Sequence, residues 1–139
     1  MQLNHTIIKA KDKQATARFL TDVVGLPEAV DFAHGRFLIH HLDNDVSVDV
    51  SQVDTPFDPE HYAFLVTEPE FDEILARVKD RGIDYYPDPF YDARGSINTN
   101  DGGRGMYFQD PSGHDLEVIT TPYGEDNANL GRRHTENNN

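Results

Sequence analysis

Three residues in this sequence have the side chains and the placement to bind a divalent metal ion. His5 and His61 each open a segment that reads as a β-strand, and Glu117 lies between Leu116 and Val118 in another strand-like segment. Two imidazoles and one carboxylate on one ion form the facial triad that suits Fe(II), and the same donors can hold Mn(II), Zn(II) or Ni(II). The charge of such an ion stabilises a bound carboxylate or enolate. The pattern predicts a metal site made by His5, His61 and Glu117.

Alternation along the strands favours a common face for the second histidine and the glutamate. Side chains in a strand point alternately to its two faces, so Leu116 and Val118 lie on one face and Glu117 lies on the other. In the segment 60–67 the bulkiest apolar side chains likewise alternate with His61. If the bulky faces pack on helices, His61 and Glu117 both look into the opposite, concave side of the sheet.

The composition excludes several classes of protein. At 139 residues and 15.7 kDa the chain is one ordinary domain, and it contains no cysteine for a disulfide or a thiolate metal site. Its 12 Lys and Arg residues against 25 Asp and Glu residues give a net charge of −13, which argues against nucleic acid or an anionic membrane as a partner. The sequence contains neither an apolar run of membrane-spanning length nor a signal-peptide pattern. We therefore expect a cytoplasmic protein with a small-molecule substrate.

The chain carries a weak internal duplication. Two strand-like segments that begin near a His are each followed by a segment with helical spacing of apolar residues, and further strand candidates follow each helix. Residues 53–59 contain prolines and read as a linker. The predicted organisation is a first module at about 2–52, the linker at 53–59, a second module at about 60–122, and a polar, flexible tail at 123–139. The second module ends in a hairpin whose turn is Asp110–Gly113.

These features resemble the vicinal oxygen chelate superfamily, also called the glyoxalase/bleomycin-resistance/dioxygenase family. The resemblance covers roughly residues 2–122 and is most specific in "GRGMYFQDPSGHDLEV" at 103–118. It implies an α+β fold in which two βαβββ modules form an open, barrel-like mixed sheet around a metal held by residues such as His5, His61 and Glu117. Small members of the family commonly dimerise, so it also implies a homodimer with shared sites, in which His5 can come from the partner chain.

Within that family, the ligand set is most similar to the extradiol ring-cleaving dioxygenases, which favours Fe(II). Those enzymes place a Tyr ten residues before the metal Glu, and Tyr107 holds that position. The resemblance gives Tyr107 a catalytic role, as a hydrogen-bond donor to a metal-bound substrate oxygen. Asn98 stands where the dioxygenases have an acid-base His, and Arg104 lies between glycines, so we expect both to bind substrate. The expected function is a metal-dependent, extradiol-type dioxygenase on a small oxygen-bearing molecule.

Two other functions remain open. A lyase or isomerase of the glyoxalase type needs a fourth ligand, for which Asp49 is the nearest acidic candidate in the segment 45–52. A non-catalytic binding protein of the bleomycin-resistance type would need no metal. Antibiotic thiol transfer is disfavoured, because Ile7 stands where the similar fosfomycin-resistance transferases have a Thr, and the residues soon after Glu117 contain no Arg.

Three further expectations concern the remaining histidines and the longest loop. His40 and His41 cannot share one face of a strand and read as a surface pair. His114 has the opposite parity to Glu117 and reads as a turn residue. The segment 92–103 is long and polar enough to form a lid over the site.

Overall fold

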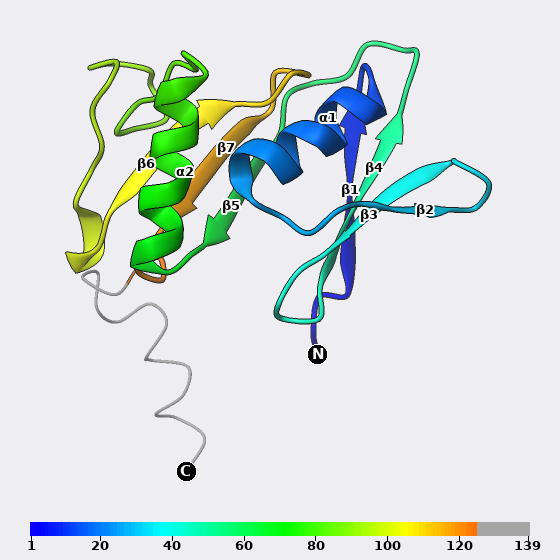
Figure 1. Ribbon diagram of the computed structural model, residues 1–139, viewed down its shortest axis with the longest axis horizontal. Helices are drawn as coiled ribbons and strands as arrows, with labels where there is room; N and C mark the ends of the chain where they lie inside the picture. Colours follow the sequence, from blue (N-terminus) through cyan, green and yellow to red (C-terminus); the bar gives the residue numbers. More distant parts are fainter. Residues whose placement is uncertain (125–139) are drawn as a thin grey trace. The chain divides into compact units, whose positions relative to one another are not determined.

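The computed structural model describes residues 1–124 of the chain, and these divide into two compact units. The first unit comprises residues 1–60 with 110–114, and the second comprises 61–109 with the residues from 115 onward. Each unit contains one mixed β-sheet and one main helix (Figure 1). The predicted α+β class is confirmed, and neither sheet closes into a barrel within residues 1–124. The predicted tail falls almost entirely outside the described residues.

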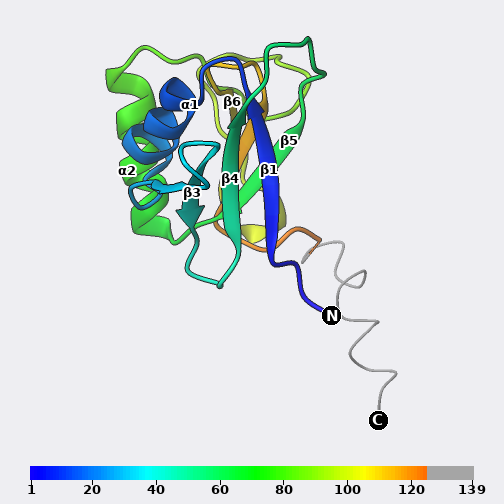
Figure 2. The same cartoon turned by 90° about the vertical axis from the view of Figure 1, so that its right-hand side faces the viewer.

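The first unit is built on a four-stranded sheet in the order β1-β4-β3-β2. Strand β1 runs parallel to β4, and the other two pairs are antiparallel; Figure 2 shows β1, β4 and β3 side by side. Helix α1 passes into a short π-helical turn and ends at Gly25, whose φ of 90° is the left-handed conformation typical of a glycine cap. The elements are β1 (His5–Ala10), α1 (Lys13–Phe19), η1 (Leu20–Val24), β2 (Val30–Phe32), β3 (Phe37–His41) and β4 (Ser47–Gln52).

The second unit repeats this plan with a three-stranded sheet in the order β5-β7-β6. Helix α2 begins at a capping box, in which Thr67 and Glu70 satisfy each other's backbone N–H groups, and Pro69 occupies its first turn. The helix lies along one face of the sheet (Figure 1). The elements are β5 (His61–Leu65), α2 (Glu68–Asp80), η2 (Asn100–Gly102), β6 (Gly105–Gln109) and β7 (Asp115–Ile119).

The duplication predicted from the sequence is visible in the strand pairing. Strand β1 pairs in parallel with β4, and β5 pairs in parallel with β7. In the described part of the chain, the second unit lacks a full counterpart of β2, because the segment after α2 contributes only two isolated bridges to β6, from Tyr86 to Tyr107 and from Asn98 to Gly105. Pro87 and Pro89 follow directly, and a proline has no N–H to donate to a strand ladder. The expected extra strand in this module is therefore reduced to isolated residue pairs.

The two cores leave one face of each sheet uncovered by its own helix. In the second unit the buried helix residues are Phe71, Ile74 and Val78, and the buried sheet residues are Met106, Phe108, Leu116 and Val118. In the first unit the buried set includes Ile8, Leu20, Val23, Leu38, Val48 and Val50. The alternation predicted for β7 is confirmed, so its remaining side chains lie on the open face.

Two histidines read as surface or turn residues are fully buried. The prediction that His40 lies on the surface is wrong, because it lies on the face of β3 that α1 covers. Its Nδ1 lies 2.8 Å from the carbonyl oxygen of Pro27. His114 follows the hairpin turn, where its Nδ1 accepts a hydrogen bond from the Glu60 N–H and its Nε2 donates to the Lys9 carbonyl. Both side chains are structural partners of the backbone in the first unit.

Candidate functional site

His61 and Glu117 meet on the open face of the second sheet. His61 is the first residue of β5 and Glu117 the third of β7, and their side chains approach until Nε2 lies 3.1 Å from Oε2. The histidine side chain keeps 48% of its surface exposed, whereas the carboxylate keeps 12%. The sequence-based expectation that these two side chains lie together is thus met by the geometry.

The other ring nitrogen of His61 determines what Nε2 can do. Nδ1 lies 3.1 Å from the backbone carbonyl oxygen of Asp115, and because a carbonyl only accepts, this contact is a hydrogen bond when Nδ1 carries the ring proton. In the neutral imidazole Nε2 then presents a lone pair, and that lone pair faces an acceptor oxygen of Glu117. The contact between Nε2 and Oε2 is satisfied either by a proton between the two atoms or, with the ring proton on Nδ1, by a metal ion that both atoms bind. Metal-binding histidines commonly have this second contact to a backbone carbonyl.

Tyr107 completes the cluster from the neighbouring strand. It is the cross-strand partner of Glu117 in the β6–β7 pair, and its hydroxyl donates a hydrogen bond to that carboxylate. Its ring stacks on the imidazole of His61, with centroids 5.9 Å apart. Desolvation, and secondly the hydrogen bond to Glu117, raise the pKa of Tyr107 well above its ordinary value. The phenol therefore stays protonated at neutral pH and acts as a donor.

Asp115 and Tyr91 belong to this face although the sequence did not single them out. Asp115 lies two residues before Glu117 and shares its parity, which was the available signal. The Tyr91 hydroxyl donates a hydrogen bond to Asp115 Oδ1, and Gln109 Nε2 lies 3.3 Å from the same oxygen. Desolvation, followed by this hydrogen bond, raises the pKa of Tyr91. Tyr91 could not be found from periodicity because it lies in a loop.

His5 and Asp49 occupy the corresponding places in the first unit. The register aligns His5 with Ser47 and Ile7 with Asp49, just as it aligns His61 with Asp115 and Ala63 with Glu117. Asp49 therefore lies on the uncovered face of its sheet, where its Oδ1 accepts a hydrogen bond of 2.9 Å from the Ser47 hydroxyl. His5 Nδ1 lies 2.7 Å from the side-chain oxygen of Asn4. Within residues 1–124, no group of three His, Asp or Glu side chains is gathered closely enough to form a complete metal site.

The two predicted substrate-binding residues serve the protein itself in this structure. Arg104 lies over the Phe71 ring, and its guanidinium binds the carboxylates of Glu68 and Asp72 on α2, at 2.7 and 2.8 Å. Its side chain thus points to the helix side of the sheet, away from Tyr107 on the open face, and this geometry does not support a role in binding a substrate anion.

Asn98 anchors the long loop to the edge of the sheet. Its backbone bridges Gly105, and its side-chain amide donates to the Pro87 carbonyl at 2.7 Å. A Cβ atom at Gly105 would lie only 2.8 Å from the Asn98 side chain, so the glycine permits this close approach. The amide is used within the loop, and a contact to substrate stays a prediction.

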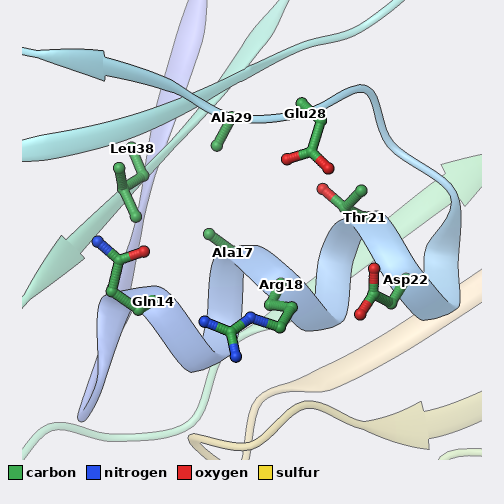
Figure 3. Close-up of a pocket in the computed structure, with 8 residues that line it drawn as sticks. All are labelled: Gln14, Ala17, Arg18, Thr21, Asp22, Glu28, Ala29 and Leu38. Carbon is green, nitrogen blue, oxygen red and sulfur yellow. The ribbon is translucent and has the colours of Figure 1, made fainter.

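The first unit contains a pocket of about 360 Å³. Figure 3 shows Arg18 and Asp22 on α1 and the turn after it, with Glu28 on the facing segment. None of the predicted metal ligands lines this pocket, whose walls are Gln14, Ala17, Arg18, Thr21, Asp22, Glu28, Ala29 and Leu38. Within residues 1–124, no helix has the length and apolar character to span a membrane.

Comparison with known proteins identifies the family. Residues 2–118 match the Glyoxalase/Bleomycin resistance protein/Dioxygenase superfamily, and the chain belongs to it. Two solved structures are similar over 89% of this chain. Oxidase ChaP-H1 is 51% identical, with a TM-score of 0.85 and 98% of its own chain covered. Oxidase ChaP-H2 is 49% identical, with a TM-score of 0.82 and 96% of its own chain covered. Glutathione transferase FosA of Serratia marcescens is 28% identical over 120 residues, which cover 84% of this chain and 78% of that protein.

Proposed function

We propose that the chain is a metal-dependent oxidoreductase that holds one divalent ion with His61, Glu117 and His5 and binds a small, oxygen-bearing organic molecule beside it. Among the activities of the superfamily, we place it closest to an extradiol-type dioxygenase, with Fe(II) as the favoured ion. The observation that carries the proposal is the pair of facing acceptors, His61 Nε2 and Glu117 Oε2, 3.1 Å apart.

The chemistry of the three donors suits a divalent ion, and the spacing of the His61–Glu117 pair supports it. Two donors bound at about 2.1 Å to one ion and at right angles to each other lie about 3.0 Å apart. The spacing of the His61 and Glu117 donor atoms is close to that value. A bound ion supplies positive charge that polarises substrate oxygens, and iron can also exchange electrons. Imidazole and carboxylate donors with positions left open suit Fe(II) in particular.

The protein groups around the pair would orient the substrate and move its proton. The Asp115 carbonyl would orient the imidazole by accepting a hydrogen bond from Nδ1–H, and Nε2 would then be the nitrogen that binds the ion. Tyr107 holds a proton on its hydroxyl and directs it toward Glu117. A phenol of this kind can transfer its hydrogen bond to a substrate oxygen that arrives next to the carboxylate. Glu117, which is largely buried, is then left as the anionic ligand.

The relatives favour oxidation over the other activities of the superfamily. The two structures with about half of their residues identical to this chain are both named oxidases. The glutathione transferase relative is more distant, at 28% identity. Because small members of the family commonly share their sites between two chains, we also propose a homodimer in which His5 of the partner subunit completes each site.

Elemental analysis of protein purified without chelator or metal-affinity tag tests the proposal. We expect about one iron ion per chain in the wild type and a loss of that iron in Glu117→Ala. Glu73→Ala is the matched control, because Glu73 lies on α2 and pairs with Arg77. Retention of metal by Glu117→Ala, or a wild type that takes up no metal after reconstitution, would contradict the proposal and favour a binding protein.

A lyase or isomerase of the glyoxalase type is the second candidate. The observation that favours it is the register of β1 and β4, which gives Asp49 the place in its sheet that Glu117 has in the other. That reaction would use Asp49 as a fourth ligand. Zinc or nickel in place of iron, lost on substitution of Asp49, would favour this candidate.

A further inference from the structure

The long segment between α2 and β6 is tied to the sheet at three separated places. Its residues Tyr86 and Asn98 bridge Tyr107 and Gly105 of β6, with backbone hydrogen bonds of 2.8 to 3.0 Å. Between these two points, residues 87–97 leave the edge of the sheet. The third attachment is Tyr91, whose hydroxyl donates to Asp115 Oδ1.

The attachment by Tyr91 crosses a strand. The sheet order is β5-β7-β6, and the segment pairs with the outer edge of β6, whereas Asp115 is on β7. The segment must therefore fold back over β6 at Gln109 to reach Asp115, and Gln109 itself contacts both Tyr91 and Asp115. Residues 87–97 thus cover part of the open face, at the end of the sheet where His61 pairs with Asp115.

The backbone of this segment is under local strain that the tyrosine contacts offset. Tyr91 and Ala93 have φ values of 62° and 55°, a left-handed conformation that is unfavourable for residues other than glycine. The Tyr91 ring packs edge-on against Tyr86, with centroids 4.8 Å apart. Next to it, Phe90 keeps 81% of its surface exposed. Other contacts hold the base of the segment, where the Gly95 N–H donates to the Tyr85 carbonyl at 2.8 Å and the Asn98 amide donates to the Pro87 carbonyl at 2.7 Å. The Tyr91 hydrogen bond ties the strained part of the segment to the open face of the sheet, and that part is poised to move away when the bond is lost.

We propose that Tyr91 is a positioning residue and that residues 87–97 are the gate of the metal site, held closed by the hydrogen bond from Tyr91 to Asp115. The inference rests on the proposed function, because His61 and the gate share Asp115: the imidazole binds its carbonyl and the phenol binds its carboxylate. Opening moves Tyr91 away and exposes the side of the imidazole. The exposed Phe90 then gives the entrance an apolar side for an incoming organic substrate.

Cleavage by trypsin after Arg94 reports on opening, because Arg94 is the single Lys or Arg between Gly82 and Gly103. The variant is Tyr91→Phe, which keeps the ring against Tyr86 and removes the hydroxyl, and the matched control is Tyr85→Phe. We expect the variant to be cleaved after Arg94 about tenfold faster, since the cleavage rate follows the population of the open state and one charge-assisted hydrogen bond is lost. Cleavage after Arg81, at the end of α2, should stay unchanged in both variants.

The second measurement connects the gate to the site. Wild type and Tyr91→Phe are loaded with Fe(II), and the rate at which a chelator removes the ion is followed; we expect faster release from the variant. Unchanged cleavage after Arg94 would show that the hydrogen bond from Tyr91 to Asp115 does not hold the gate closed. If cleavage after Arg81 became equally faster, Tyr91 would instead stabilise the fold as a whole. Unchanged metal release despite faster cleavage would overturn the gate. A wild type that binds no metal would remove the proposed function and the gate with it.

Discussion

The hydroxyl of Tyr107 donates its hydrogen bond to Glu117, the residue directly across the β6–β7 pair. The same phenol ring stacks on His61, so one side chain contacts both members of the acceptor pair. This arrangement separates two roles that a substitution can test. Ring packing orients the imidazole, and the hydroxyl supplies a proton or a hydrogen bond.

Tyr107→Phe should lower turnover without emptying the metal site. Removal of a positioned proton donor typically costs about 100-fold in kcat, whereas the phenylalanine ring still stacks on His61. The measurements are kcat on an oxidisable substrate and metal content by elemental analysis. Because the pKa of Tyr107 is raised, wild-type activity should not fall through loss of its proton below about pH 10, the ordinary value for a tyrosine. A variant with normal kcat would remove Tyr107 from the mechanism.

A site shared between two chains can be distinguished from a site within one chain by mixing variants. His5→Ala and His61→Ala should each bind no metal. If His5 of the partner subunit completes the site, a mixed dimer has one site with both substitutions and one site with neither. Random exchange makes about half of the dimers mixed, so about a quarter of an ion per chain should return on mixing. Two different tags verify that subunits have exchanged. If metal binding is still absent after exchange, both histidines of a site belong to one chain.

Asp49→Asn discriminates between the two candidate functions. The register places Asp49 as the counterpart of Glu117 in the first sheet, and its carboxylate accepts a hydrogen bond from Ser47. Under the three-ligand proposal the variant should keep its full metal content and most of its oxidase activity. Loss of the ion would instead identify a fourth ligand and move the protein to the lyase or isomerase class. Asp45→Asn, in the turn before β4, is the control for a change of charge.

The sequence predicted most elements because their apolar spacing is local. The stripe Phe71, Ile74 and Val78 on α2 and the alternation around Glu117 both follow from a single period along the chain, and both are observed. His40 was misread because its burial depends on which face of β3 the helix α1 covers, a tertiary fact that no local pattern contains. Arg104 was expected near the substrate because local sequence did not reveal its partners in the protein. These partners are two carboxylates on α2, which lie far from Arg104 in the sequence.

His114→Ala should lower the free energy of unfolding by about 3 kcal/mol, because it removes a fully buried side chain together with its partly buried hydrogen bonds to one backbone N–H and one backbone carbonyl. These groups belong to Glu60 and Lys9, and the imidazole also stacks on Phe57 with centroids 5.4 Å apart. Denaturant unfolding of the purified protein measures the change. His41→Ala, at an exposed position of β3, should change stability by less than about 0.5 kcal/mol. Equal effects of the two substitutions would refute the structural role of His114.

Stability in mildly acidic solution should depend on His40. Burial, partly opposed by the hydrogen bond to Pro27 and by the charge of Glu28, lowers the pKa of His40. The unfolded chain therefore takes up a proton at about pH 6.5, where the folded protein does not. The contribution of His40 is fully present above that pH and is lost as the pH falls toward the lowered value, at up to about 1.4 kcal/mol per pH unit.

Denaturant unfolding between pH 7.5 and 5, on metal-free protein, checks this prediction about the acid side of the stability profile. His40→Gln should be less stable at neutral pH but should lose less stability on acidification than the wild type, because glutamine takes up no proton. His41→Gln, which alters the exposed neighbour, should follow the wild-type profile. If wild type and His40→Gln lose stability in parallel as the pH falls, the buried imidazole does not cause the loss. The loss of stability in acid would then come from the carboxylates.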